Sequence, residues 1–190
     1  MIYLLDTNIF REMLEHFPKR GKTFEEIWER FEKWIKDGVI FSVDECYNEL
    51  TRHYDEKNEH YQWLQDRREM FLNPSNVESI YIRDLFQDTK MRESIHRRNI
   101  IENRPAADAY LATKAKALGA IVVTKEKYKA GSAQLPNVCE ALGVRWISYD
   151  DFMEKLSVGM WLLIIAIIWW VGGNLCCTLQ GVLRREDEDW

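Results

Sequence analysis

The chain opens with an apolar run, Ile2 to Leu5, which ends at an acidic residue, Asp6. A run that is apolar at every position predicts a strand covered on both faces, as in a parallel sheet. A carboxylate at the end of such a strand needs a donor, an ion partner or a metal, because burying an unpaired anion is costly. Two interpretations follow: Asp6, with Thr7 and Asn8, caps the next helix, or Asp6 belongs to a functional site.

Strand and helix patterns alternate along the rest of the chain. Strands are predicted at 39–42, 120–124 and 144–147, and helices at 24–36, from 44, at 106–118, at 138–142 and from 148. This alternation predicts an α/β fold, a Rossmann-like three-layer α/β/α arrangement with a central parallel sheet. The segment at about 53–103 has a helical pattern and is interpreted as a helical insertion.

The insertion is locally basic, although the whole chain is acidic. Towards its end, six basic residues outnumber the nearby acids Asp84, Asp88, Glu93 and Glu102; the basic residues are Arg83, Lys90, Arg92, Arg97, Arg98 and Arg104. This segment is either a solvated helix face or a flank that contacts phosphates.

Length and composition limit the classes of function. The 190 residues, 46% of them hydrophobic, suit one compact domain with a core. The net charge of −5 provides no global cationic field, so a polyanion must be held locally or through metal ions. The four cysteines lack zinc-site spacing and the start lacks a signal peptide, which predicts a cytoplasmic location. No phosphate-binding glycine loop is present, and the four histidines receive no role.

Five acids are expected to meet at one edge of the sheet. In a doubly wound fold, the carboxyl ends of the strands and the amino ends of the helices lie at the same edge. The acids placed there by the predicted elements are Asp6, Glu45, Glu49, Asp108 and Glu126. Crowded carboxylates repel one another unless protons or cations intervene, and oxygen ligands suit Mg²⁺ or Mn²⁺. Two such ions would activate water against a phosphodiester, which predicts a nuclease.

These residues also form a pattern that resembles the PIN-domain metal-dependent ribonucleases, many of which are toxins of bacterial toxin-antitoxin pairs. The resemblance covers nearly the whole of residues 1–156, and the 135–144 segment looks like one uncharacterised PIN-like branch. The segments that carry it are 4–8 (LLDTN), Ser42 with Glu49-Leu50, 107–112 (ADAYLA), 122–126 (VVTKE) and 135–144 (LPNVCEALGV).

The resemblance implies a metal site and an activity. Its metal-binding and catalytic acids would be Asp6, Glu49, Asp108 and Glu126, with Glu126 at a position where the family more often has Asp. Glu45 competes structurally with Glu49, but the Glu-Leu match favours Glu49. Thr7, Asn8 and Thr124 are expected to orient Asp6 or a bound water; alternatively, Thr7 and Asn8 only cap the helix.

The implied function is a Mg²⁺- or Mn²⁺-dependent endoribonuclease, the toxin of a pair, with RNA and a cognate antitoxin as partners. A homodimer is left open. The alternative is a PIN-like module that binds RNA or protein with weak or no catalysis. Retention of several mutually repelling acids favours the nuclease, since a binding module has no need of them.

The carboxyl-terminal tail departs from the family pattern. Residues 157–183 contain no charged residue, and a short charged end follows at 184–190. The expected organisation is therefore a PIN-like domain at 1–157 and an apolar tail at 158–183. The tail is interpreted as a transmembrane helix or a membrane contact through 158–179, which would anchor a cytoplasmic domain. The competing interpretations are a buried element, an oligomer contact or foreign sequence.

Overall fold

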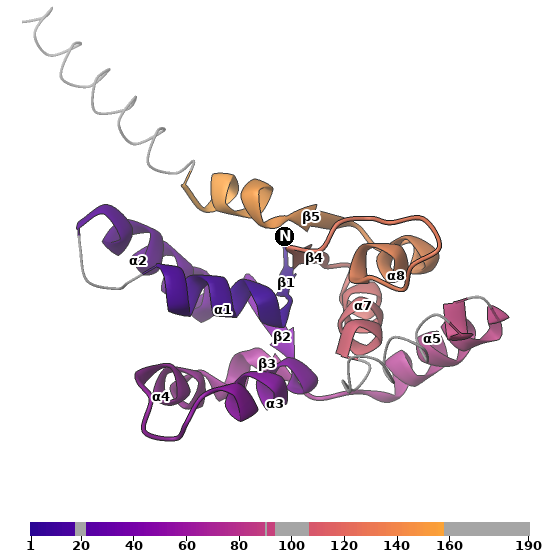
Figure 1. Ribbon diagram of the computed structural model, residues 1–190, viewed down its shortest axis with the longest axis horizontal. Helices are drawn as coiled ribbons and strands as arrows, with labels where there is room; N and C mark the ends of the chain where they lie inside the picture. The colour runs from indigo at the N-terminus through magenta and orange to yellow at the C-terminus, as the bar shows by residue number, and fades with distance from the viewer. Residues whose placement is uncertain (18–21, 90, 94–106, 158–190) are drawn as a thin grey trace, which may run out of the picture. The chain divides into compact units, whose positions relative to one another are not determined.

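A computed structural model of the chain describes residues 1–17, 22–89, 91–93 and 107–157 (Figure 1). The chain divides into two compact units, residues 1–152 and 153–190. Of the second unit, residues 153–157 are described and are helical. The predicted apolar tail at 158–183 and the predicted membrane contact through 158–179 lie outside the described residues. Among the described helices, none combines the length and apolarity needed to cross a bilayer.

The first unit is built on a five-stranded parallel sheet with strand order β3-β2-β1-β4-β5. The strands are β1 (Tyr3–Leu5), β2 (Ile40–Val43), β3 (Phe71–Leu72), β4 (Ile121–Thr124) and β5 (Trp146–Ser148). The opening apolar run therefore forms the central strand, as its lack of polar positions predicts. The α/β class with a central parallel sheet is confirmed.

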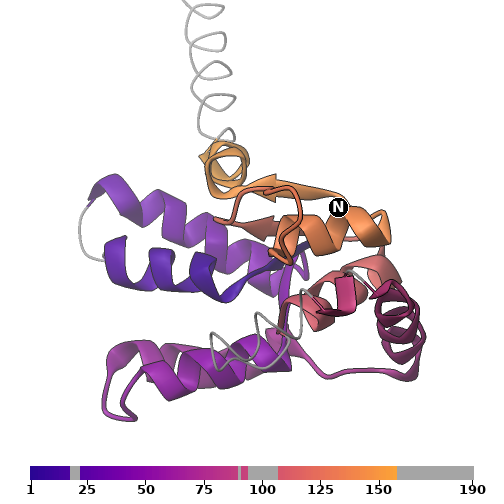
Figure 2. The same ribbon diagram turned by 45° about the vertical axis from the view of Figure 1, so that its right-hand side comes forward.

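Helices cover both faces of this sheet. The α1 helix (Thr7–His16) and α2 (Lys22–Lys36) lie on one side, and α7 (Ala107–Leu118) and α8 (Leu135–Leu142) lie on the other (Figures 1 and 2). The α3 helix (Asp44–His53) follows β2 directly, and α4 (Glu59–Asp66) packs against α3. The α5 helix (Asn76–Gln87) packs against α7. This is the three-layer arrangement that the sequence predicts.

The segment at 53–103 is not wholly helical. After α4, a 3₁₀ turn at Arg68–Met70 leads into β3, which pairs with β2 at the edge of the sheet. A two-residue strand is too short to produce a periodic pattern, so the sequence could not distinguish it from the helices around it. A capping box formed by Ser75 and Glu78 is present at the start of α5.

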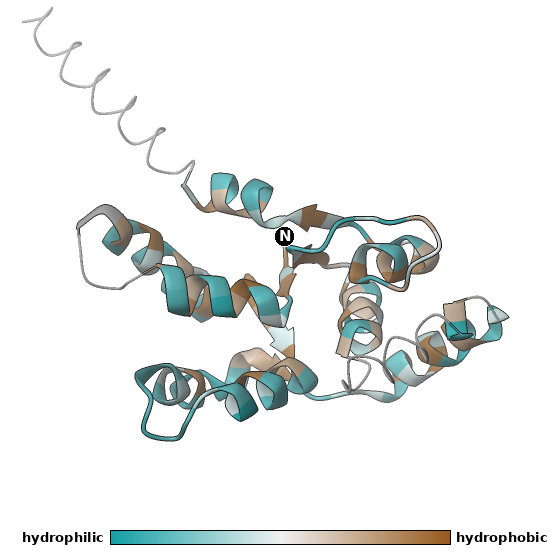
Figure 3. Ribbon diagram, in the orientation of Figure 1, coloured by the Kyte–Doolittle hydropathy of each residue, from teal (hydrophilic) through white to brown (hydrophobic). Residues whose placement is uncertain are grey.

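The core is largely aromatic between α1, α2 and α4. The rings of Phe10, Phe31 and Trp63 contact one another and are almost fully buried. Figure 3 shows hydrophobic residues along β4 and β5, while the outer surfaces of the helices are largely hydrophilic. The apolar face of α2 therefore packs in the core.

Candidate metal and nuclease site

Asp6 lies at the carboxyl end of the central strand and is 6% exposed. Parallel pairing of β1 with β4 places Thr124 beside it, and the Thr124 hydroxyl donates to Oδ2 of Asp6 at 2.9 Å. The side-chain amide of Asn8 donates to the same oxygen at 3.3 Å. Asp6 occupies the N-cap position of α1, but its side chain makes no capping hydrogen bond. The capping interpretation therefore does not account for this carboxylate.

The charge on Asp6 is disfavoured by its surroundings. Burial, followed by the negative charge of Glu126, raises the pKa of Asp6 to about 6. The Thr124 hydrogen bond opposes this shift, and the charge of Glu49 adds to it. Carboxylates from the ends of two strands and from α3 therefore act on one another through a low-dielectric site.

Glu49 lies on α3 and is joined to the start of α1. Its Oε2 accepts a hydrogen bond of 2.7 Å from the Thr7 hydroxyl. Thr7 follows Asp6 directly, so this bond fixes the position of Glu49 relative to the end of β1. The expected orienting roles of Thr124 and Asn8 toward Asp6 have matching contacts, but Thr7 contacts a different acid.

Glu45 lies in other surroundings, although it is only one helical turn from Glu49. Burial raises its pKa, with further contributions from the charges of Asp44 and Glu78, while the charge of Lys114 opposes them. Its Oε2 is buried without a hydrogen-bond partner among the described residues. None of these neighbours belongs to the site at Asp6, so the geometry favours Glu49 over Glu45.

Glu126 follows β4 and performs a structural task. Its Oε2 accepts a 2.7 Å hydrogen bond from the backbone N–H of Leu135, the first residue of α8. Its own backbone N–H donates to the Thr124 hydroxyl at 3.1 Å. A carboxylate at a helix amino terminus stabilises the helix. This residue therefore contributes negative charge near Asp6 while it caps α8.

Asp108 lies in the first turn of α7, as the sequence predicts. After burial, the charges of Asp108 and Asp6 both raise the pKa of the Cys139 thiol, so Cys139 lies near both acids. The structure thus brings together Asp6, Glu49 and Glu126, here called the acidic cluster, and places Asp108 at its border.

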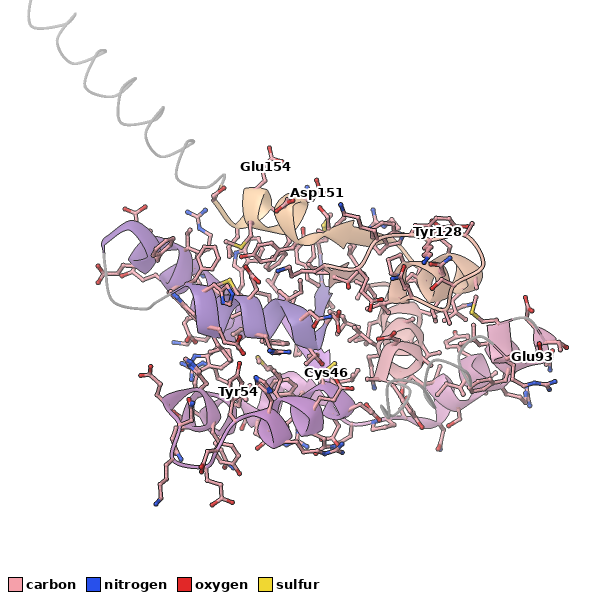
Figure 4. The ribbon with its side chains drawn as sticks, in the orientation of Figure 1. Cys46, Tyr54, Glu93, Tyr128, Asp151 and Glu154 are labelled. Atoms are coloured by element: carbon pink, nitrogen blue, oxygen red, sulfur yellow. The ribbon has the colours of Figure 1, made fainter. Side chains whose placement is uncertain are left out.

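A buried cysteine on α3, for which the sequence pattern carries no signal, lies next to this cluster. Burial, then the charge of Asp6, raises the pKa of the Cys46 thiol to about 12. Figure 4 labels Cys46 beside α1 and α3. Nearby, the Ser42 hydroxyl donates to the backbone carbonyl of Leu5 at 2.7 Å, which ties the ends of β2 and β1 together. A neutral thiol and a satisfied hydroxyl form the floor of the site.

The donor chemistry of these acids suits a hard divalent cation, since carboxylate oxygens are the usual ligands of Mg²⁺ and Mn²⁺. In the positions observed, no three Asp, Glu, His or Cys side chains within the described ranges converge closely enough to hold an ion. One oxygen each of Glu49 and Glu126 is already hydrogen-bonded. A metal would therefore need rotation of these two side chains, and it would relieve the repulsion at Asp6.

The basic segment predicted in the insertion is only partly described. Arg83 lies on α5 with a side chain 70% exposed, and its guanidinium is 3.7 Å from the carboxylate of Asp84. Arg92 is exposed. The other basic residues of this segment lie outside the described residues: Lys90, Arg97, Arg98 and Arg104.

A family model matches residues 3–160, and its description is a domain of unknown function, DUF4411. The chain belongs to this family. No curated protein matches the chain.

Solved structures share the fold of this DUF4411 protein at low sequence identity. VapBC2 from Rickettsia felis, bound to a DNA fragment from its promoter, has a TM-score of 0.50 at 17% identity, covering 78% of this chain and 98% of that one. VapBC-1 from nontypeable Haemophilus influenzae has a TM-score of 0.47 at 18% identity, covering 79% and 99%. The similarity to the first confirms the predicted PIN-like α/β fold.

Proposed function

We propose that this protein is a metal-dependent endoribonuclease and the toxin of a bacterial toxin-antitoxin pair. The observation that carries the proposal is the acidic cluster. A buried carboxylate at the end of the central strand lies beside two further carboxylates that raise its pKa. Such mutual repulsion lowers the stability of the folded chain without metal. A divalent cation would be attracted to the same carboxylates and would remove the repulsion on binding.

The four predicted acids would share the binding of Mg²⁺ or Mn²⁺: Asp6, Glu49, Asp108 and Glu126. A bound ion of this kind supplies activation of water and stabilisation of the leaving oxygen of a phosphodiester. The chain itself positions the ligands. Thr124 and Asn8 hold Oδ2 of Asp6, and Thr7 holds Oε2 of Glu49. These donors place both carboxylates at the end of β1 before any ion arrives, and the Glu49 side chain would turn about this position to meet an ion.

The proposed partners are RNA and a cognate antitoxin. Both of the compared structures are two-component VapBC complexes, which supports a protein partner for this chain. RNA is proposed because of the chemistry expected at the acidic cluster. An enzyme with this substrate would act in the cytoplasm.

A second candidate is a PIN-like module that binds RNA or protein with little or no cleavage. The hydrogen bond from Leu135 to Glu126 favours it, because an acid that caps a helix is less available to a metal. In this case the chain would retain the fold and its partners but would not hydrolyse RNA.

The test is cleavage by the purified full-length chain of a mixture of structured and single-stranded RNA, with Mg²⁺, Mn²⁺ or EDTA. We expect cleavage with one of the ions and none with EDTA. Asp6→Asn should abolish cleavage without loss of fold. The matched control is Asp66→Asn, which removes an exposed acid from the end of α4 and should cleave like the parent. Absence of cleavage by a folded parent with either ion would favour the binding module.

A further inference from the structure

The loop that leaves the acidic cluster is basic and carries an exposed aromatic ring. It connects β4 to α8 over residues 125–134 and contains Lys125, Lys127 and Lys129 around Tyr128. Tyr128 is 51% exposed, and both flanking lysines are exposed. In a chain with a net charge of −5, this local excess of positive charge is unusual. Alternation of lysine with an aromatic residue suits a single-stranded nucleic acid.

The lysines of the loop have different environments. Lys125 forms an ion pair with Glu12 of α1, and its ammonium lies 5.7 Å from the centre of the Tyr149 ring. Lys127 and Lys129 form no ion pair with any residue in the described part of the chain. Lys125 thus anchors the base of the loop, while the other two charges face solvent beside Tyr128.

The loop backbone is held in place directly after Tyr128. The side chain of Asn137, which is 7% exposed, contacts both backbone polar groups of Lys129. Its Oδ1 accepts from the Lys129 N–H at 3.2 Å, and its Nδ2 donates to the Lys129 carbonyl at 2.9 Å. At the start of the loop, Glu126 is fixed by its hydrogen bond to Leu135. A ring on a fixed backbone loses little conformational entropy when a base stacks on it.

We propose that residues 127–129 form a binding site for single-stranded RNA, in which Tyr128 stacks on a base and Lys127 and Lys129 contact the adjacent phosphates. This inference rests on the proposed function and names the element that holds its substrate. Figure 4 shows Tyr128 beside α8, on the opposite side of the sheet from α1. The stacked base therefore belongs to a nucleotide that lies to one side of the phosphodiester at Asp6.

Stacking on a tyrosine does not read the identity of the base, because every base has a π-face. The loop therefore selects unpaired RNA over a duplex, in which the faces of the bases are covered by their neighbours. The loop would contribute affinity for RNA and a preference for single strands, and any sequence preference would come from other contacts.

The experiment measures binding separately from cleavage. Full-length chain carrying Asp6→Asn is titrated, in EDTA, into fluorescein-labelled single-stranded oligoribonucleotides, and anisotropy gives the dissociation constant. We expect Tyr128→Ala to weaken binding about tenfold, and Tyr128→Phe to remain within about twofold of the parent, since the phenyl ring retains the stacking face. An oligoribonucleotide of the same length with abasic positions should bind the parent and Tyr128→Ala almost equally.

The lysines are tested by the salt dependence of the same binding. Lys127→Ala and Lys129→Ala should each reduce the slope of log K against log salt by about 0.7, as expected for one phosphate contact on a single strand. Lys57→Ala removes an exposed lysine from the turn between α3 and α4 and should leave the slope unchanged. Thermal melting of each variant confirms that the fold is retained.

Three results would overturn the inference: no RNA binding by the folded parent, equal affinity of Tyr128→Ala and the parent, or tighter binding of duplex than of single strand. Its failure is distinguishable from failure of the nuclease proposal. Metal-dependent cleavage that is indifferent to Tyr128 would retain the nuclease and reject the loop. Binding that requires Tyr128, without cleavage under any ion, would retain the loop and reject the nuclease.

Discussion

Asp6 and Glu78 are both buried carboxylates, but the protein surrounds them with opposite charges. Glu78, 3% exposed, lies on α5, where its Oε1 is 2.6 Å from the ammonium of Lys114 on α7. Lys114 is 6% exposed and also donates to the backbone carbonyl of Asn73 at 2.7 Å. Around Asp6, in contrast, the negative charges of Glu126 and Glu49 both raise the pKa of the carboxyl.

This difference separates a structural acid from a candidate functional one. Between α5 and α7 the fold provides its own cation, and the pair joins two helices on one side of the sheet. At the acidic cluster, hydroxyl and amide donors orient the carboxylates, while the charges of Glu126 and Glu49 repel that of Asp6. Repulsion of this kind is typical of sites that bind a cation from solution. Substitutions of Lys114, Asp6, Glu126 and Glu45 test how far this contrast holds.

The largest expected effect is at the paired acid. Lys114→Met leaves Glu78 buried without its cation and should lower the free energy of unfolding by about 3–5 kcal/mol. Urea denaturation at pH 7.5 measures it. Adding Glu78→Gln should recover most of the loss, because glutamine is neutral and still suits the capping box. Lys116→Met, which removes an exposed lysine of the same helix that lies over the Tyr81 ring, should cost less than about 1 kcal/mol. A small loss for Lys114→Met would contradict the contrast.

At the unpaired acid the sign should reverse. Asp6→Asn removes a buried negative charge and should raise the free energy of unfolding in EDTA by about 1–2 kcal/mol, since one unit of pKa corresponds to about 1.4 kcal/mol. The asparagine oxygen can still accept from Thr124. The measurement is urea denaturation at pH 8 without metal. A destabilised variant would mean that the carboxylate contributes to folding as Glu78 does.

Glu126 combines both kinds of role, and two substitutions separate them. Glu126→Ala removes the acceptor for the Leu135 N–H and should cost about 1 kcal/mol, as expected for loss of a helix cap. Glu126→Gln keeps an acceptor oxygen and should fold with nearly the parent stability. Comparison of cleavage rates then isolates the charge. If the glutamine variant cleaves like the parent, Glu126 acts only as a cap and is not a metal ligand.

The smallest effect is expected at Glu45, whose Oε2 is buried without a partner among the described residues. Its pKa is raised in the folded state, first by burial. The folded chain therefore holds this proton more tightly than the unfolded chain, and stability falls as pH rises through the window between the two pKa values. Glu45→Gln should raise the melting temperature slightly at pH 7.5. The gain should vanish near about pH 4, where the carboxyl is protonated in both states. A gain independent of pH would exclude this explanation.

The sequence predicts the fold well because its main signals are local. The apolar run before Asp6 identifies a strand buried on both faces, and the alternation of strands and helices predicts a parallel sheet. Thr124 and Glu126 were placed near Asp6 by the same reasoning. Predictions failed where an element is very short or where a residue's role depends on a contact outside its own element. The β3 strand is two residues long, and the capping role of Glu126 depends on where α8 begins, at Leu135.

The contrast between buried charges was also not visible in the sequence. Lys114 is one of two lysines on a helix rich in alanine, and nothing in its immediate neighbours indicates that it is buried. The spacing of Ser75 and Glu78 indicates a capping box, but it carries no sign of the ion pair with Lys114. The distinction between Glu45 and Glu49 depends likewise on which helix each one faces, and this is a tertiary property.

The order of the strands also determines when the site can exist. Asp6 directly follows the central strand, yet its Thr124 donor is 118 residues further along the chain. During synthesis, at about 5–20 residues per second, the first three strands leave the ribosome well before β4. A nascent chain that ends before residue 124 lacks the strand that brings Thr124 and Glu126 to Asp6. An arrested translation product of this length would therefore lack the assembled acidic cluster, and the protein acquires its complete site only after β4 has been synthesised.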